Sequence, residues 1–209
     1  MPTVFYHPYM PASDSIPVIT AQEHRLGRRL LCEGLSTLYR LSFSEDTVEE
    51  QLCKEENGKP FLKDFPQIHF NITHCSGLAA CAFHSSPIGV DAELPGYFAP
   101  ILVRKVLTEE EAHLLSVKGT DHLSRDEWFF RLWTLKEAYV KMTGTGVDVP
   151  LRDFSFSFGE DGEIACSDRT ASCFQKKLES GHILSLCVRS GSDSTPIQLI
   201  HSRSVGTGL

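Results

Sequence analysis

The stretch Trp133-Thr134-Leu135-Lys136-Glu137-Ala138-Tyr139-Val140-Lys141 lies inside the longest helical pattern of the chain, which runs from Asp126 to Thr143 and ends at Gly144 and Gly146. At about 100° per residue, four polar or aromatic side chains of this helix fall within about 140° of one another. They are Trp133, Lys136, Glu137 and Lys141. The opposite side of the helix carries an apolar stripe, which predicts that this side faces the core. The stripe consists of Leu132, Leu135, Tyr139 and Met142.

The charged side of this helix has two interpretations. Glu137 and Lys141 stand four residues apart and could form a simple surface ion pair, worth about 0.3–0.5 kcal/mol. The mixture of an indole, a carboxylate and two ammonium groups also suits a metal-bound pyrophosphate. In that case Glu137 would be a ligand of Mg²⁺ and the lysines would contact phosphate oxygens.

A short β-strand is predicted upstream of the helix, from Ile88 to Glu93. Residues two apart on a strand point to the same side, so Asp91 and Glu93 are expected to project together. Neighbouring carboxylates repel each other unless protons or a cation intervene, and Mg²⁺ prefers oxygen ligands. The pair is therefore a candidate metal site, although acidic residues at a solvated strand end would show the same pattern.

The first half of the chain contains a helix and two further strands. Apolar residues recur at helical spacing from Ala21 to Leu41. A charged stretch follows, and then a turn is predicted at residues 57–60, Asn-Gly-Lys-Pro. Strands are predicted over residues 68–73 and 77–84.

The second half repeats this organisation. A helical segment is predicted from Tyr97 to Leu107, followed by a short helix with a capping box of Thr108 and Glu111. After the long helix, period-two patterns predict strands around residues 154–158, 172–178 and 182–188, and the polar tail from residue 190 is expected to fray. We therefore predict an α+β fold of two similar halves, residues 1–94 and 95–209. Each half is expected to be a helix packed on a small, largely antiparallel sheet.

Composition excludes several classes of protein. The 209 residues carry 20 basic and 27 acidic side chains, a formal charge of −7, so the chain lacks the basic field of a general nucleic-acid binder. We expect no signal peptide at the N-terminus, and no run of 18 apolar residues that could span a membrane. None of the seven cysteines forms a Cys-x-x-Cys pair, which favours a reducing, cytoplasmic location over a zinc ribbon.

Three shorter features carry groups that could bind phosphate. Thr73 and His74 end a predicted strand, where they could contact a phosphate, although a buried core histidine is more common. Lys59 precedes Pro60 in the predicted turn and could also be an ordinary exposed lysine. The first helix carries an arginine cluster that could equally be a solvated face: Arg25, Arg28 and Arg29.

Taken in order, these motifs resemble the 4′-phosphopantetheinyl transferase family of the Sfp type. The matching strings are Gly-Lys-Pro at 58–60, Phe-Asn-Ile-Thr-His-Cys-Ser-Gly at 70–77, Gly-Val-Asp-Ala-Glu at 89–93, and Trp-Thr-Leu-Lys-Glu-Ala-Tyr-Val-Lys-x-x-Gly-x-Gly at 133–146. The second string departs slightly from the family pattern, because Thr73 and Cys75 stand where serine is common. Thr73 keeps the hydroxyl group.

The resemblance implies a pseudo-twofold monomer that binds coenzyme A between its halves and transfers 4′-phosphopantetheine to a serine of a carrier protein. Asp91, Glu93 and Glu137 would hold Mg²⁺, for which Mn²⁺ could substitute. Asp91, Glu137 and Lys141 would be the catalytic residues, with Lys141 on the phosphate that is cleaved and Lys136 supporting the pyrophosphate. Glu137 or Glu93 would accept the proton of the attacking serine.

The same resemblance implies the residues that bind the other end of coenzyme A. Thr73 and His74 would contact the 3′-phosphate with the help of Arg28. Lys59 and Pro60 would line the adenine.

The expected partner is an acyl or peptidyl carrier protein. Such proteins are usually acidic, so binding to a chain of net charge −7 requires a local patch. The segment from Tyr97 to Val106 combines apolar side chains such as Phe98 with Arg104 and Lys105, and is the predicted docking surface, although an ordinary half-buried helix would have the same composition. Two other functions fit the motifs less completely: a non-catalytic carrier- or nucleotide-binding module of the same fold, and another Mg²⁺-dependent phosphotransferase acting on a nucleotide pyrophosphate.

Overall fold

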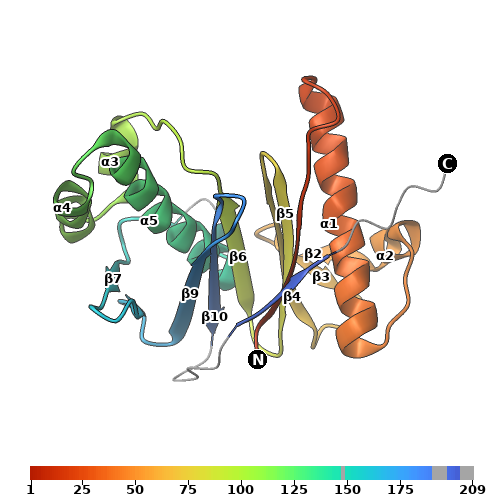
Figure 1. Cartoon of the computed structure of the whole chain (residues 1–209). Helices are drawn as coiled ribbons and strands as arrows, with labels where there is room; N and C mark the ends of the chain where they lie inside the picture. The colour runs from red at the N-terminus through yellow and green to blue at the C-terminus, as the bar shows by residue number, and fades with distance from the viewer. Residues whose placement is uncertain (147–148, 190–196, 203–209) are drawn as a thin grey trace.

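The computed structural model describes residues 1–146, 149–189 and 197–202 (Figure 1). Its first elements are β1 (Thr3–Pro8), α1 (Ile16–Tyr39), α2 (Glu45–Gln51), β2 (Leu52–Lys54), β3 (Pro60–Leu62), β4 (His69–Cys75) and β5 (Leu78–His84). These are followed by β6 (Ile88–Glu93), α3 (Ile101–Val106), α4 (Glu109–Lys118), α5 (His122–Thr143), β7 (Phe156–Phe158), β8 (Ile164–Cys166), β9 (Ala171–Lys177), β10 (Ile183–Arg189) and β11 (Gln198–His201). The mixture of helices and small sheets confirms the predicted α+β class.

Two sheets lie between two long helices (Figure 1). The first sheet has the strand order β11-β1-β5-β4, antiparallel except where β11 pairs in parallel with β1. The second sheet has the order β6-β10-β9 and is wholly antiparallel. Helix α1 covers the first sheet and α5 covers the second. Each half is therefore a helix on a largely antiparallel sheet, as predicted.

Because successive side chains of a strand point to opposite faces, alternate residues of each strand contact different layers of the molecule. Along β5, residues 79, 81 and 83 lie in the apolar cluster under α1, whereas residues 78, 80 and 82 lie in a cluster between the two sheets. On β6, Ile88, Val90 and Ala92 belong to that same central cluster. The alternate residues Gly89, Asp91 and Glu93 are thereby directed to the other face, the one that α5 covers.

Gly89 permits the close packing of α5 on β6. A Cβ atom at this position would lie 2.1 Å from the carbonyl oxygen of Ala138 and 2.3 Å from the amide nitrogen of Met142. Only glycine lets the helix backbone lie this close to the strand. Gly34 of α1 has the corresponding role in the first half, because a Cβ there would lie 2.1 Å from the ring of Phe83.

Several element boundaries differ from the sequence-based predictions. Helix α1 begins at Ile16, with Pro17 in its first turn, and the charged stretch after it forms α2 behind a capping box of Ser44 and Thr47. The predicted helix from Tyr97 shrinks to α3, whose first residue is Ile101. Thr108 and Glu111 cap α4 as predicted.

The division into halves also differs in detail from the predicted boundary at residue 94. Strand β6 pairs with β10, so the second sheet begins at Ile88. In the polar tail, residues 190–196 and 203–209 lie outside the described residues, and the intervening Gln198–His201 forms β11 beside β1. Each sheet thus contains one strand from the other predicted half, β11 in the first sheet and β6 in the second. Among the described residues, no helix is long and apolar enough to cross a membrane.

Candidate active site

A charged cluster lies where β4, β6 and α5 meet. The Lys141 ammonium donates to Asp91 Oδ1 at 2.6 Å and to the Thr73 hydroxyl at 3.1 Å. Thr73 donates to the same Asp91 oxygen at 3.2 Å. Asp91 is 5% exposed, and its charge is held in this buried position by the two donors. The structure therefore brings together three of the predicted site residues, from three separate elements.

Glu93 and Glu137 complete the acidic part of the cluster. Burial and the charge of Asp91 raise the pKa of Glu93 to about 7, and the same two causes raise the pKa of Glu137. Burial raises the pKa of Asp91 as well, against the opposing effect of Lys141. Three carboxylates that disfavour one another's ionisation form a site that a cation would stabilise.

The donor atoms of the cluster are those that a hard metal ion prefers. The second oxygen of Asp91, Oδ2, is buried and has no hydrogen-bond partner among the described residues, which is an unusual state for a carboxylate oxygen. With Glu93 and Glu137 nearby, the donors are all hard oxygens of the kind that Mg²⁺ prefers. As the side chains stand, no group of three or more acidic, histidine or cysteine residues in the described part of the chain is arranged to hold a metal. The donor chemistry fits Mg²⁺, and binding would require these carboxylates to converge.

His74 lies on the opposite face of β4 from Thr73, towards α1. Its Nδ1 atom is 3.1 Å from Oε2 of Glu23, and its ring lies 5.9 Å from that of His24, centroid to centroid. Burial lowers the pKa of His74, Glu23 opposes this shift, and His24 and Lys141 add to it. His74 adjoins the charged cluster, because the preceding residue, Thr73, belongs to it.

Arg28 lies farther along α1 and is bound to another partner. Its guanidinium forms an ion pair with Glu49 of α2, and this contact lowers the pKa of Glu49. The effect of His24 on the same carboxylate places Glu49 near the histidine pair. Arg28 would therefore have to exchange Glu49 for a phosphate in order to bind one.

Lys59 and Pro60 lie at the other end of β6. The Lys59 ammonium donates to the carbonyl oxygens of Met142, at 2.7 Å, and Ile88, at 3.2 Å, and burial lowers its pKa to about 8. It thereby ties the β2–β3 hairpin to the C-terminal end of α5. Lys59 and Pro60 also line a cavity of about 210 Å³, together with Glu55, Phe61, Pro66, Ile68, His69 and Phe70.

Lys136 does not join the charged cluster, contrary to the prediction that it supports a pyrophosphate. Its ammonium is fully buried and donates to Leu151 O at 2.6 Å and Phe154 O at 2.7 Å. It also forms an ion pair of 2.9 Å with Glu111, whose other oxygen accepts from the amide of Phe156. Helical spacing put Lys136 on the charged side of α5, but a loop covers that position and turns the lysine into a structural link.

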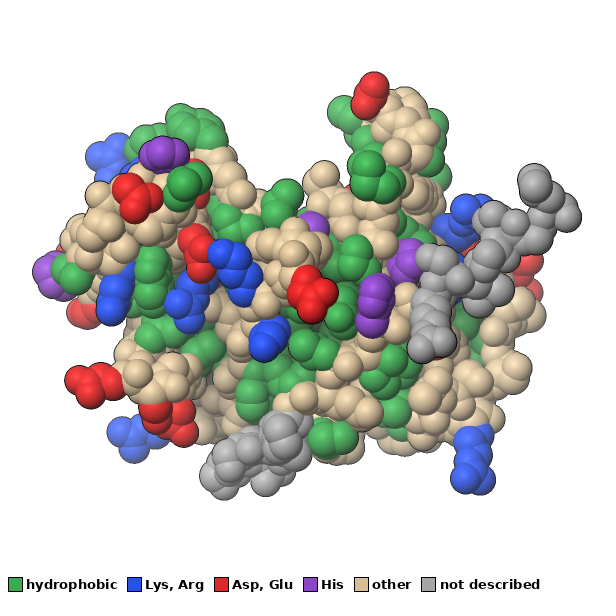
Figure 2. Space-filling model, viewed as in Figure 1, with side chains coloured by type: hydrophobic (Ala, Val, Ile, Leu, Met, Phe, Trp, Pro, Cys, Tyr) green, Lys and Arg blue, Asp and Glu red, His purple; other side chains and the backbone are tan. Residues whose placement is uncertain are grey.

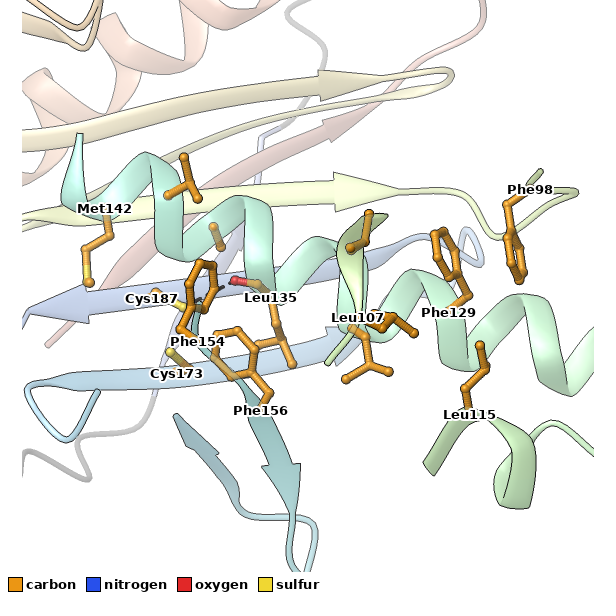
Figure 3. Packing of buried hydrophobic residues seen from close by; sticks show 14 residues of the cluster. Phe98, Leu107, Leu115, Phe129, Leu135, Met142, Phe154, Phe156, Cys173 and Cys187 are labelled. Carbon is orange, nitrogen blue, oxygen red and sulfur yellow. Dashed lines mark hydrogen bonds between the residues drawn. The ribbon is translucent and has the colours of Figure 1, made fainter. Parts of the chain in front are cut away.

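The predicted docking segment is also only partly available. Figure 3 shows Phe98 in the core beside Phe129, where the two rings stack 3.8 Å apart. Phe98 is 4% exposed and cannot contact a partner, whereas Tyr97 is 86% exposed and Ile101 is 44% exposed. The segment therefore offers a smaller apolar surface than its composition indicated.

The surface of the molecule is hollowed between its two halves. Figure 2 shows the molecule indented between the lobe that carries α3 and α4 and the N-terminal end of α1. Strand β6 ends at Glu93, and from there the chain runs on to α3 beside this hollow (Figure 1). Lys59 and Pro60 lie at the opposite end of the same strand.

Sequence reasoning missed the acidic partner of His74. Glu23 sits in the first helix next to the arginine cluster, and its carboxylate also accepts from the Tyr9 hydroxyl at 2.6 Å. The predicted helix began at Ala21, so Glu23 lay within it, but helix periodicity alone gave no reason to pair it with a strand residue 51 positions away. Only the packing of α1 on β4 reveals this contact.

Comparisons with known proteins agree with these motifs. A family model described as the 4′-phosphopantetheinyl transferase superfamily matches residues 87–190. The chain is 30% identical to 4′-phosphopantetheinyl transferase Sfp of Bacillus subtilis (strain 168) over 166 residues, which is 78% of this chain and 71% of that protein. It is 27% identical to 4′-phosphopantetheinyl transferase psf-1 of Bacillus pumilus over 88% of this chain and 78% of that protein. Among solved structures, the holo-[acyl-carrier-protein] synthase of Thermotoga maritima aligns with 51% of this chain and 64% of its own, with a TM-score of 0.43 and 20% identity.

Proposed function

This chain belongs to the 4′-phosphopantetheinyl transferase superfamily, and on that premise we propose that it transfers the 4′-phosphopantetheine group of coenzyme A to a serine of a carrier protein. It is accordingly a transferase, and 3′,5′-ADP is the second product. The observation that carries the proposal is the junction of β4, β6 and α5. There Thr73, Asp91 and Lys141 lie within hydrogen-bond distance, and Glu93 and Glu137 lie beside them.

We propose that the three carboxylates hold Mg²⁺, with Mn²⁺ as a possible substitute. Asp91 Oδ2, which no described residue contacts by a hydrogen bond, would be one ligand, and Glu93 and Glu137 would supply the others. When bound, the metal ion would neutralise charge on the pyrophosphate. Asp91 Oδ1 would remain bound to Lys141, so the lysine stays directed towards the same site.

Coenzyme A is the proposed co-substrate, and its 3′-phosphate and 5′-pyrophosphate are carried by one ribose, so neighbouring residues can bind both. Lys141 would contact the phosphate at which cleavage occurs. His74 and Thr73 would contact the 3′-phosphate, assisted by Arg28 once it leaves Glu49. The cavity beside Lys59 and Pro60 would take the adenine.

The proposed reaction needs a base and a charge stabiliser. The carrier serine Oγ attacks the β-phosphorus of coenzyme A, the bond from this phosphorus to the bridging oxygen breaks, and 3′,5′-ADP carries that oxygen away. Glu93 or Glu137 accepts the serine proton, directly or through water. Negative charge grows on the departing phosphate, where the Lys141 ammonium stabilises it.

The carrier protein is proposed to dock on the exposed part of the segment from Tyr97 to Val106. Tyr97 and Ile101 supply apolar area, and Arg104 and Lys105 in the last turn of α3 supply positive charge for an acidic partner. We infer that one chain suffices for this reaction, because all proposed site residues come from a single copy. The cytoplasmic location expected from the cysteines stays a prediction.

Mass spectrometry of a carrier protein tests the function directly. Purified protein, coenzyme A, Mg²⁺ and an apo acyl or peptidyl carrier protein are incubated together, and the carrier is expected to gain one phosphopantetheine group on its serine. Release of a nucleotide product without modification of any carrier would favour another phosphotransferase activity. Binding of the carrier or of coenzyme A with no product at all would favour a non-catalytic module.

A further inference from the structure

Glu23 is an acidic residue beside the proposed phosphate site, although its negative charge would oppose the binding of a phosphate. It is 9% exposed, and a carboxylate so deeply buried must be compensated by hydrogen bonds. Its Oε1 accepts from the Tyr9 hydroxyl at 2.6 Å, and its Oε2 lies 3.1 Å from Nδ1 of His74. Both oxygens are therefore engaged, and neither is available to a ligand.

Tyr9 keeps the Glu23 carboxylate in this place. Its amide donates to Gly77 O at 2.9 Å, and its hydroxyl also lies 3.2 Å from Cys75 O, so the residue is fastened to the turn between β4 and β5. Burial and the neighbouring Glu23 raise the pKa of the Tyr9 hydroxyl, which therefore remains a donor. The carboxylate is held against the same strand that carries His74.

The contact with Glu23 determines what His74 can do. With Nδ1 facing the carboxylate, Nε2 is the ring nitrogen left for a ligand, and in the neutral ring it is only an acceptor. A phosphate group offers acceptors, so Nε2 must carry a proton to bind it, and His74 must then be an imidazolium. The other groups around the ring, His24 of α1 and Lys141 of α5, are both basic and oppose that charge.

We propose that Glu23 is a positioning residue that makes His74 a phosphate ligand, by orienting its ring through Nδ1 and by supplying the counter-charge for the imidazolium. This inference rests on the proposed function, since it assigns His74 to the coenzyme A phosphate. Glu23 itself does not touch coenzyme A. The prediction is a specific effect on coenzyme A binding, without an effect on the chemical step.

The variant Glu23→Gln tests this role, because it keeps the size of the side chain and removes its charge. We expect the KM for coenzyme A to rise about tenfold, which corresponds to about one pKa unit of lost imidazolium stabilisation. The kcat at saturating coenzyme A should not change. Since the imidazolium is present below the pKa of His74 and lost above it, the rise of KM with pH should begin at a lower pH in the variant.

Three comparisons separate positioning from a general structural effect. Glu33→Gln changes a glutamate of the same helix that is bonded to Ser202 instead, and it should leave the KM unchanged. In a His74→Ala background, Glu23→Gln should add nothing further, because the two residues act as one unit. If Glu23→Gln melts below the assay temperature, Glu23→Asp replaces it. Aspartate keeps the negative charge but holds it farther from His74, so the KM for coenzyme A should rise by less than the tenfold expected for Glu23→Gln.

The outcomes distinguish this inference from the proposed function. A wild type that modifies no carrier serine would overturn the function itself, whatever the variants show. With an active wild type, an unchanged KM in both Glu23 variants would overturn the role of Glu23. Additive effects of Glu23→Gln and His74→Ala, or an equal fall in kcat, would overturn it as well.

Discussion

At the scale of single residues, the candidate site depends on one buried carboxylate with two different oxygens. Asp91 Oδ1 accepts hydrogen bonds from Lys141 and Thr73, whereas Oδ2 has no partner in the part of the chain that the structure describes. A carboxylate in this state is stable only if something else compensates the second oxygen. A cation is the proposed compensating group, and the neighbouring Glu93 and Glu137 are the other proposed ligands.

Removing the metal-facing oxygens of Asp91 should therefore abolish transfer. For Asp91→Ala we expect a rate loss on the order of 10²–10³ or more, because charge stabilisation of the reacting phosphate disappears. The measurement is the rate of carrier modification at several Mg²⁺ concentrations, with circular dichroism as a check on folding. Glu127→Gln, which changes a surface partner of Lys177, serves as the control and should retain full activity. Near-normal turnover of Asp91→Ala at low Mg²⁺ would contradict the metal assignment.

Lys141 and His74 should give opposite kinetic defects. Lys141→Ala is expected to lower kcat far more than it raises the KM for coenzyme A, because the charge it faces grows mainly in the transition state. His74→Ala should mainly raise the KM, because its proposed phosphate is already charged in the ground state. Steady-state kinetics with varied coenzyme A measure both constants. If Lys141→Ala mainly raised the KM and His74→Ala mainly lowered kcat, Lys141 would contact the 3′-phosphate and His74 the phosphate that is cleaved.

At the scale of elements, the network of Lys136 and Glu111 links α5 to α4 and to the loop that precedes β7. Glu111 is a capping residue of α4 and also receives the amide of Phe156, while Lys136 binds two carbonyl oxygens of the loop. Buried ion pairs contribute little net stability compared with an apolar pair, but losing one partner leaves the other charge uncompensated.

Lys136→Met should therefore destabilise the fold without a selective effect on coenzyme A. We expect a loss of about 3–5 kcal/mol in the free energy of unfolding, because Glu111 keeps its buried charge. Urea denaturation measures this loss. The double variant Glu111→Leu with Lys136→Met should recover part of it. A stable Lys136→Met protein with a strongly raised KM for coenzyme A would instead restore the role in pyrophosphate binding.

At the scale of the whole molecule, the two halves meet at the edges of β4 and β6. Asn71 Oδ1 accepts from the amide of Val90 at 2.9 Å, and Thr73 reaches Asp91, so polar side chains connect strands of different sheets. Strand β11 extends the sheet of the first half, and His182 at the start of β10 contacts Ser76 O of the β4–β5 turn at 2.8 Å. These contacts hold the two sides of the hollow in a defined relation (Figure 2).

The surface beside this hollow yields the prediction for the carrier protein. Tyr97→Asp and Ile101→Asp, at exposed positions, should raise the KM for an acidic carrier without changing that for coenzyme A, because they remove apolar contact and add like charge. Modification rates at limiting carrier concentration measure the effect. Phe98→Asp is expected to unfold the protein, since it places a charge in the stack with Phe129. Unchanged rates for both exposed variants would place docking elsewhere.

Local patterns in the sequence determined most of the elements. The short run from Ile88 to Glu93 predicted β6 with its observed bounds, and the capping pair Thr108 and Glu111 predicted the start of α4. The resemblance of the motifs predicted the family. Such signals lie in residues near one another along the chain, and they depend on backbone geometry that neighbouring residues control.

Only the tertiary structure determined which of the predicted site residues lie close together. Lys136 and Glu137 are adjacent in sequence, yet a loop covers the first and leaves the second beside Asp91. Phe98 reads as part of an exposed apolar segment but packs on Phe129, and Glu23 meets His74 only because α1 lies on β4. Burial and long-range contact depend on how layers pack, and periodicity within one element specifies a face without specifying what covers it.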